Sequence, residues 1–297
     1  MSVTKSDKIA LQPTGDRPDL SIRLAVAMTL LAVILEAPPQ MSVLATSAAI
    51  AGLLLQSLIR NRWFWLVLLL LFSLSPIRRP WAALDNHNWL QVYWFAAIAV
   101  TRWTTNPDAS LRLVARWLLG LAFAFAVTWK LLAPEFIGGD FFEFTFVSDH
   151  RLGDVLVALG VQDAGTVATN RSVIADWRDA GVEVTGSDAL VSRAAMLLGP
   201  PLAWLTILIE GAVAVAYLAP LPDRFRWARD ATLLLFIVAT YPLAPVIPFG
   251  WLLIAMGAAT SDLPPRIVAP TYVAAFVLVG LLSERSALLE MLSNLLS

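Results

Sequence analysis

The chain has 297 residues, of which 58% are hydrophobic and only 14% are charged, and its mean hydropathy is +0.72. Soluble domains carry nearer 25% charged residues, so this composition excludes an ordinary soluble domain and indicates an integral membrane protein. The net charge of −1 gives no indication of a nucleic-acid partner. The sequence has no cysteine, which excludes disulfides and thiolate metal sites, and two histidines do not indicate a metal centre.

The polar and basic residues 1–20 precede the first apolar run and are predicted to form a cytoplasmic tail. This tail is longer than the start of a signal peptide, and no small-residue cleavage site follows the apolar run. We therefore expect an uncleaved first membrane span.

A helix that crosses a bilayer needs roughly 20 mostly apolar residues, and shorter cores suffice where polar flanks reach the interface. We predict an all-α polytopic membrane protein: a bundle of about eight or nine transmembrane helices with one extracytoplasmic insert. The predicted spans are residues 21–37, 41–59, 63–76, 88–102, 111–132, 198–219, 229–242, 245–260 and 266–284.

These spans divide the chain into parts. Residues 21–132 contain the first five helices, residues 133–197 form the insert, and residues 198–284 contain the last helices. Residues 285–297 place leucines at helical spacing, which predicts an amphipathic tail at the membrane interface.

Three prolines, Pro242, Pro245 and Pro248, interrupt the apolar region 229–260. Each proline lacks a backbone donor and clashes with the preceding turn, so the helix breaks there. The region is then either two short spans or one re-entrant hairpin, whose unpaired backbone must be buried in protein or line a cavity.

Basic residues in alternate loops orient the bundle. They fall on one side if nine spans alternate, and the positive-inside rule places that side in the cytoplasm. These residues are Arg60, Arg62, Arg102, Arg112, Arg116, Arg224, Arg226 and Arg229. We predict a cytoplasmic N-terminus, an extracytoplasmic C-terminus and, for a bacterial chain, location in the inner membrane.

The insert has ten acidic and four basic side chains, a balance of −6, and no apolar run of about 20 residues. We predict a non-spanning extracytoplasmic cap over the end of the bundle. The alternative is a long loop without a role.

Arg78 and Arg79 fall on the extracytoplasmic side in this orientation. Either a span boundary is misplaced, or the two arginines bind an anionic lipid headgroup or substrate.

Lys130 lies at the end of an apolar span, where an ammonium group costs a few kcal/mol, so it is a candidate functional residue. The alternative is a lysine that extends its head to the interface. His87, at the start of the fourth span, is predicted at the same extracytoplasmic level, as a proton shuttle or as a loop residue at the helix mouth.

Depth along the spans predicts which charges pair. Glu210 lies about 18 Å from the extracytoplasmic side, Arg116 about 24 Å and Lys130 about 3 Å. We therefore expect Glu210 to be buried in a structural pair with Arg116, in preference to Lys130, or to be bonded to another inward-facing donor. Lys130 is then left without an acid, and a neutral amine could act as a general base.

Four segments carry a resemblance to a known family. Residues 85–90 (Asp-Asn-His-Asn-Trp-Leu) resemble a stretch in the membrane part of vitamin K-dependent γ-glutamyl carboxylase and the related bacterial HTTM-domain proteins. Residues 129–131 (Trp-Lys-Leu) with 136–139 (Phe-Ile-Gly-Gly) are similar to that family's lysine segment. Glu210 falls where the family has an acid, and residues 248–251 (Pro-Phe-Gly-Trp) resemble its Phe-Pro-Tyr helix start.

The resemblance implies a quinol-dependent enzyme in which Lys130 is the base and His87 assists it. An isoprenoid quinone would be the cofactor, with Asn86, Trp89, Trp129 and Phe136 around its head group and no metal. The sequence departs from the family because the expected histidine near residues 235–238 and the large extracytoplasmic domain are missing. Peptide carboxylation is therefore not expected.

Two other functions fit the sequence. The chain could be a non-catalytic accessory or assembly subunit of a membrane complex, since a fold does not determine a function. It could also be a lipid- or quinone-binding protein, because proline-broken helices can line binding sites. The predicted partners are membrane lipids and either a soluble extracytoplasmic domain or other membrane subunits.

Overall fold

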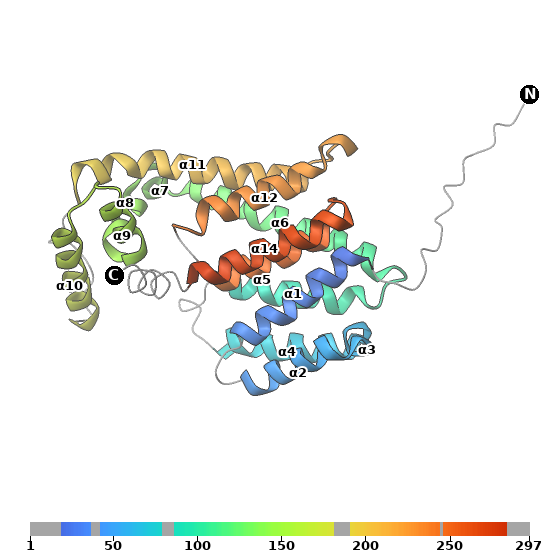
Figure 1. Cartoon of the computed structure of the whole chain (residues 1–297). Coiled ribbons are helices and arrows are strands. Elements are labelled where there is room, and N and C mark those ends of the chain that lie inside the picture. The colour runs from blue at the N-terminus through green and yellow to red at the C-terminus, as the bar shows by residue number, and fades with distance from the viewer. Residues whose placement is uncertain (1–18, 37–41, 79–85, 181–190, 244–245, 284–297) are drawn as a thin grey trace, which may run out of the picture.

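The computed structural model describes residues 19–36, 42–78, 86–180, 191–243 and 246–283 of the chain (Figure 1). Every regular element in these residues is a helix and none is a strand, which confirms the all-α prediction. The predicted tails, 1–20 and 285–297, lie almost entirely outside the described residues.

The helices follow the apolar segments of the sequence. They are α1 (Leu20–Glu36), α2 (Ser42–Leu54), α3 (Gln56–Arg60), α4 (Arg62–Arg78), α5 (Asn86–Thr101), α6 (Pro107–Leu132), α7 (Pro134–Gly138), α8 (Asp140–Ser148), α9 (His150–Ala158), α10 (Ala164–Ala180), α11 (Arg193–Leu218), the 3-10 turn η2 (Asp223–Phe225), α12 (Trp227–Thr240), α13 (Ile247–Thr260) and α14 (Pro265–Ser283).

Every predicted span coincides with helical structure. The span predicted at 41–59 is divided into α2 and α3 because Leu55 has extended backbone angles, φ −111° and ψ 92°. In the described residues, three helices are long and apolar enough to cross a membrane: α6, α11 and the part of α14 from Pro265 to Leu282. These helices indicate a membrane protein.

The proline-rich region separates α12 from α13, as both interpretations of the sequence require. α12 ends at Thr240 and α13 begins at Ile247. Pro248 lies in the first turn of α13, where a missing backbone donor breaks no intrahelical hydrogen bond.

Helix α13 is the centre of the bundle and packs against α1, α6 and α14. Its residues from Gly250 to Thr260 are all buried, as expected for a helix that is apolar on every side. The Trp251 indole donates a hydrogen bond to the Phe276 carbonyl (3.0 Å), and the two rings stack 5.0 Å apart. These contacts join α13 to α14.

Helices α6 and α11 form an antiparallel pair along one side of the bundle (Figure 1). Gly120 on α6 lies against Leu218, where an added Cβ would be 2.6 Å from the leucine side chain. Further along, Gly139 between α7 and α8 lies against Gly199 near the start of α11, and its added Cβ would be 2.7 Å from the Gly199 carbonyl carbon. Glycines therefore fix the register of the pair at both ends.

One end of the bundle gathers the arginines and is called the basic end here. Arg112 contacts the Asp19 carboxylate, and Arg229 donates to Asp262 at 3.2 Å. The basic end comprises the start of α1, the α3–α4 and α5–α6 turns, the end of α11 and the start of α12. Its arginines are the ones that the sequence analysis placed on one side.

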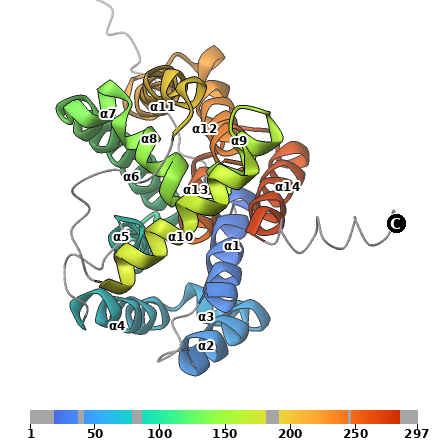
Figure 2. The ribbon, with the colours of Figure 1, turned by 90° about the vertical axis from the view of Figure 1, so that its left-hand side faces the viewer.

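The opposite end, called the insert end, carries α7–α10. Phe146, Leu152, Leu156 and Ala195 form a small separate core that joins these helices to α11. Helices α9 and α10 lie across the front of the bundle in the end view of Figure 2. The insert is therefore folded into helices over this end.

The outer faces of the long helices expose large apolar side chains. A surface of this kind marks contact with a membrane or a partner. Examples are Val67, Leu70, Phe125, Trp129, Leu205, Leu208, Leu235, Val238, Val273 and Val277.

Candidate functional site

Lys130 and Glu210 form an ion pair between α6 and α11. The Lys130 Nζ atom lies 2.6 Å from Oε1 and 2.5 Å from Oε2 of Glu210. The lysine side chain is 20% exposed and the glutamate side chain 9%. Distances this short are typical of a charge-assisted pair, in which an ammonium group donates to a carboxylate.

Apolar side chains of α6, α7 and α11 form a small cluster beside the pair. Phe136, Ala203 and Ile207 are buried together, with Val127 packed against them. The Lys130 ammonium also lies 5.4 Å from the centroid of the Phe136 ring, within reach of a cation–π interaction. Among the described residues, the hydrogen bonds of the two charged side chains join them to each other.

The predicted pair of Glu210 with Arg116 is wrong. The Arg116 guanidinium donates to two backbone carbonyls at the end of α11, Tyr217 at 2.7 Å and Ala219 at 3.0 Å. These carbonyls are among the four at a helix end that have no partner within the helix. An arginine at this end also interacts favourably with the helix dipole.

The error came from the register of the helices. Arg116 and Lys130 are 14 residues apart on α6, about 21 Å along the axis, so one glutamate cannot reach both. α11 begins at Arg193, five residues before the predicted start of its span. Counting from Arg193 only places Glu210 deeper, so the earlier start alone does not explain the error. The start of α11 extends past the end of α6, because Gly199 contacts Gly139, seven residues after Leu132. Depths counted from the ends of the two spans therefore have no common origin.

The expectation that His87 and Lys130 face one cavity stays a prediction. Among the described residues, Lys130 forms hydrogen bonds and an ion pair with Glu210. Counted from the turn that joins α5 to α6, His87 lies about 21 Å along α5 and Lys130 about 34 Å along α6. The lysine is further from this turn because α6 has 26 residues and α5 has 16.

Of the four residues predicted around a quinone, Phe136 has a described contact with Lys130. Trp129 is 76% exposed on the outer surface, and Trp89 lies on α5. For Asn86, at the start of α5, only the backbone is described.

The predicted anion-binding pair cannot be placed. Arg79 lies outside the described residues, and only the backbone of Arg78, the last residue of α4, is described. The choice between a misplaced span boundary and an anion site therefore stays a prediction.

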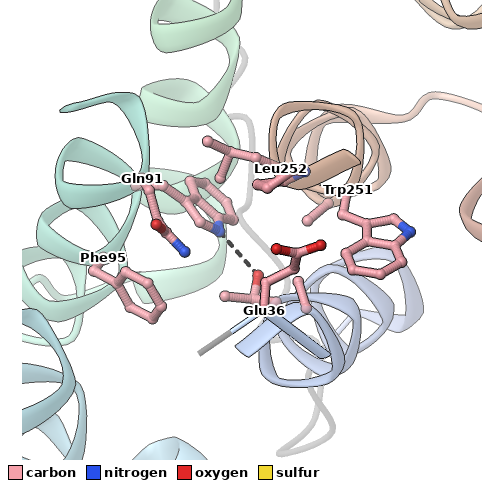
Figure 3. Close-up of a pocket in the computed structure, with 10 residues that line it drawn as sticks. Glu36, Gln91, Phe95, Trp251 and Leu252 are labelled. Carbon is pink, nitrogen blue, oxygen red and sulfur yellow. Dashed lines mark hydrogen bonds between the residues drawn. The ribbon is translucent and has the colours of Figure 1, made fainter. Parts of the chain in front are cut away.

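A small cavity with two polar side chains lies between α1, α5 and α13 (Figure 3). The Glu36 carboxylate and the Gln91 amide lie at this cavity, with Phe95 and Trp251 among its walls. The Trp94 indole closes one side by donating to Thr29 at 2.9 Å. Most of the other walls of the cavity are apolar, so Glu36 and Gln91 give it its polar character.

The sequence analysis missed this cavity, although signals for it exist. Glu36 is an acid at the end of an apolar run, and Gln91 lies one helical turn after His87. His87 and Gln91 therefore lie on the same face of α5. The two candidate catalytic residues are carried by different helices. His87 lies on the face of α5 that carries Gln91, and Lys130 lies on α6, where it pairs with α11.

Among the described residues, no group of three histidine, cysteine, aspartate or glutamate side chains could hold a metal ion. No family model matches the chain, and neither a curated protein nor a solved structure is similar to it. The resemblance to the carboxylase family therefore stays a prediction that rests on the four sequence segments.

Proposed function

We propose that this protein spans a membrane and binds the head group of a quinol-type lipid at the Lys130–Glu210 pair. The observation that carries the proposal is a hydrogen-bond donor, partly exposed, beside a buried acceptor 2.5–2.6 Å away, between two long apolar helices. A quinone or quinol head group presents carbonyl or hydroxyl oxygens on an aromatic ring. The Lys130 ammonium, the Glu210 carboxylate and the Phe136 ring match these features.

The pairing changes the roles that the family resemblance implies. An amine bonded to both oxygens of a carboxylate acts as a charged donor and not as a free base. Glu210 is then the proton acceptor, and Lys130 stabilises negative charge on the oxygen that has lost the proton. When bound, a quinol would supply the hydroxyl proton and the reducing electrons.

A direct test is titration of the purified protein in lipid nanodiscs with a short-chain naphthoquinone, followed by its absorbance. The double variant Lys130→Met with Glu210→Leu removes both charges without leaving either one unpaired. We expect it to bind roughly 10- to 100-fold more weakly, as for lost hydrogen bonds to charged groups. Arg116→Gln, at the other end of the same helix pair, is the control and should bind as the parent does.

The second candidate is a non-catalytic accessory subunit. It is favoured because both oxygens of Glu210 already accept hydrogen bonds from Lys130. Each charge already satisfies the other, so in this candidate the pair holds α6 to α11. The accessory function would then fall to exposed surfaces such as that of α10, whose main contacts among the described residues are with the insert helices α8 and α9. A parent protein that does not bind the naphthoquinone in the titration would favour this function.

The topology belongs to the same proposal. Nine passes, with the basic end in the cytoplasm and the insert outside, follow from the positive-inside rule and from the arginines at one end of the bundle. Because the chain has no cysteine, single cysteines can report the side directly. Ala168→Cys on α10 should react with an impermeant maleimide from outside intact cells, and Thr105→Cys in the α5–α6 turn should react only after permeabilisation. The reverse pattern would contradict this orientation.

A further inference from the structure

A groove lies between α1 and the α2–α3 segment and opens at the basic end. Its volume is about 240 Å³. Most of the lining side chains are apolar, and the two polar ones, Arg23 and Gln56, lie towards the basic end of α1 and at the start of α3. The remaining lining residues are Leu20, Leu24, Val26, Ala27, Leu30, Gly52, Leu53 and Ile59.

The length of the groove matches the hydrocarbon depth of one leaflet. On α1 it extends from Leu20 to Leu30, a rise of about 15 Å, which is half of a hydrocarbon core of about 30 Å. Two small residues, Ala27 and Gly52, face it from opposite walls. Gly52 is also held in place by packing, because an added Cβ would lie 2.8 Å from the Phe64 ring.

Asp19, the acid one helical turn before Arg23, does not pair with the Arg23 guanidinium. Asp19 is bonded to Arg112, to Ser21 and to the turn at the start of α1. In the described part of the chain, the Arg23 guanidinium has no hydrogen-bond or ion-pair partner, and it is exposed. An exposed cation above an apolar groove complements a ligand that carries an anionic head on a hydrocarbon chain.

We propose that this groove binds an anionic phospholipid of the leaflet at the basic end. One acyl chain lies between Leu24, Leu30 and Leu53, and the phosphate meets Arg23, with the Gln56 amide as a second donor. The site lies between other helices than the Lys130–Glu210 pair and does not depend on the proposed quinol site.

Native mass spectrometry of the full-length protein in non-ionic detergent tests the site. The protein is mixed with equimolar phosphatidylglycerol and phosphatidylcholine that have identical acyl chains, and the retained lipids are counted. We expect phosphatidylglycerol to be retained preferentially. Arg23→Gln should lower its retention about fivefold, the contribution of one arginine near an anionic headgroup. Arg224→Gln removes an exposed arginine at the same end, outside the groove, and should change nothing.

Two further arms separate a lipid from a free anion. Ala27→Trp fills the groove and should remove both lipids, and the milder Ala27→Leu serves if the larger side chain lowers the melting temperature. Inorganic phosphate at millimolar concentration should not displace phosphatidylglycerol. Equal retention of the two lipids, retention unchanged by Arg23→Gln, or displacement by phosphate would each overturn the proposal.

Discussion

The two cationic side chains of α6 that face α11 obtain their partners in opposite ways. Arg116, near the basic end, donates to backbone carbonyls at the end of α11. Lys130 is 14 residues further along and donates to the Glu210 carboxylate. A helix end offers carbonyls without intrahelical partners, whereas the interior of a helix offers none. A cation beside the interior of α11 therefore needs an acidic side chain, and the partner of each charge depends on where α11 ends.

The largest expected effect comes from removing the acid of the pair. Glu210→Ala leaves the Lys130 ammonium among apolar side chains and should lower the free energy of unfolding by about 3–5 kcal/mol. Denaturant or thermal unfolding of the detergent-solubilised protein measures this loss. A variant as stable as the parent would show that Lys130 finds other partners and that the pair is not an anchor.

The next effect concerns the contact that fixes the register near Lys130. Gly139 has φ +97°, and a Cβ there would lie 2.6 Å from the Pro200 backbone nitrogen on α11. Gly139→Ala should therefore lower the free energy of unfolding by about 1–3 kcal/mol through overpacking, in addition to the backbone strain.

Gly160→Ala is the matched control for that prediction. Gly160 has φ +68°, but an added Cβ meets nothing within 4 Å, so this variant measures backbone strain without the clash. Equal losses of stability in the two variants would mean that the close approach of α7–α8 to α11 contributes nothing.

A smaller effect is expected at the other end of the helix pair. Arg116→Gln removes hydrogen bonds to two carbonyls that lie at the end of α11, where water can replace the guanidinium. We expect a loss of about 1 kcal/mol in the free energy of unfolding, measured as for Glu210→Ala. A loss as large as that of Glu210→Ala would remove the difference between the two cations.

The smallest effect belongs to an ion pair outside the bundle. Arg171 and Asp154 on the insert lie 2.5 Å apart, but their side chains are 45% and 60% exposed. Water and salt screen such a pair, so Asp154→Asn should change the free energy of unfolding by less than about 1 kcal/mol. Unfolding at low and high salt checks this, because the contribution should vanish at high salt while that of Glu210 persists.

The sequence predicts the helices well because their ends carry local signals. Proline and polar residues bound α12 and α13, and the break between them falls at the three prolines. The span predicted at 198–219 begins five residues after α11 does, because it followed the apolar residues, whereas α11 begins at the charged Arg193.

The sequence does not predict which charges meet, because that depends on the register between helices. Counting depth from expected span ends assigned Arg116 to Glu210, whereas the glycine contacts at Gly120 and Gly139 align Glu210 with Lys130. The cavity with Glu36 and Gln91 was missed for the same reason, since its walls come from three helices distant in sequence. Lys130 could be singled out from the sequence because a charge in an apolar run is a local signal, and its functional role stays a prediction.

The central claim is that Lys130 and Glu210 stabilise the α6–α11 pair through each other. A double-mutant cycle with Lys130→Met, Glu210→Leu and both together measures this coupling through the free energy of unfolding. Each single variant should be strongly destabilised, while the double variant should be close to the parent, because an apolar replacement of a buried pair is often neutral. Additive losses in the double variant would contradict the claim and show that the two side chains act independently.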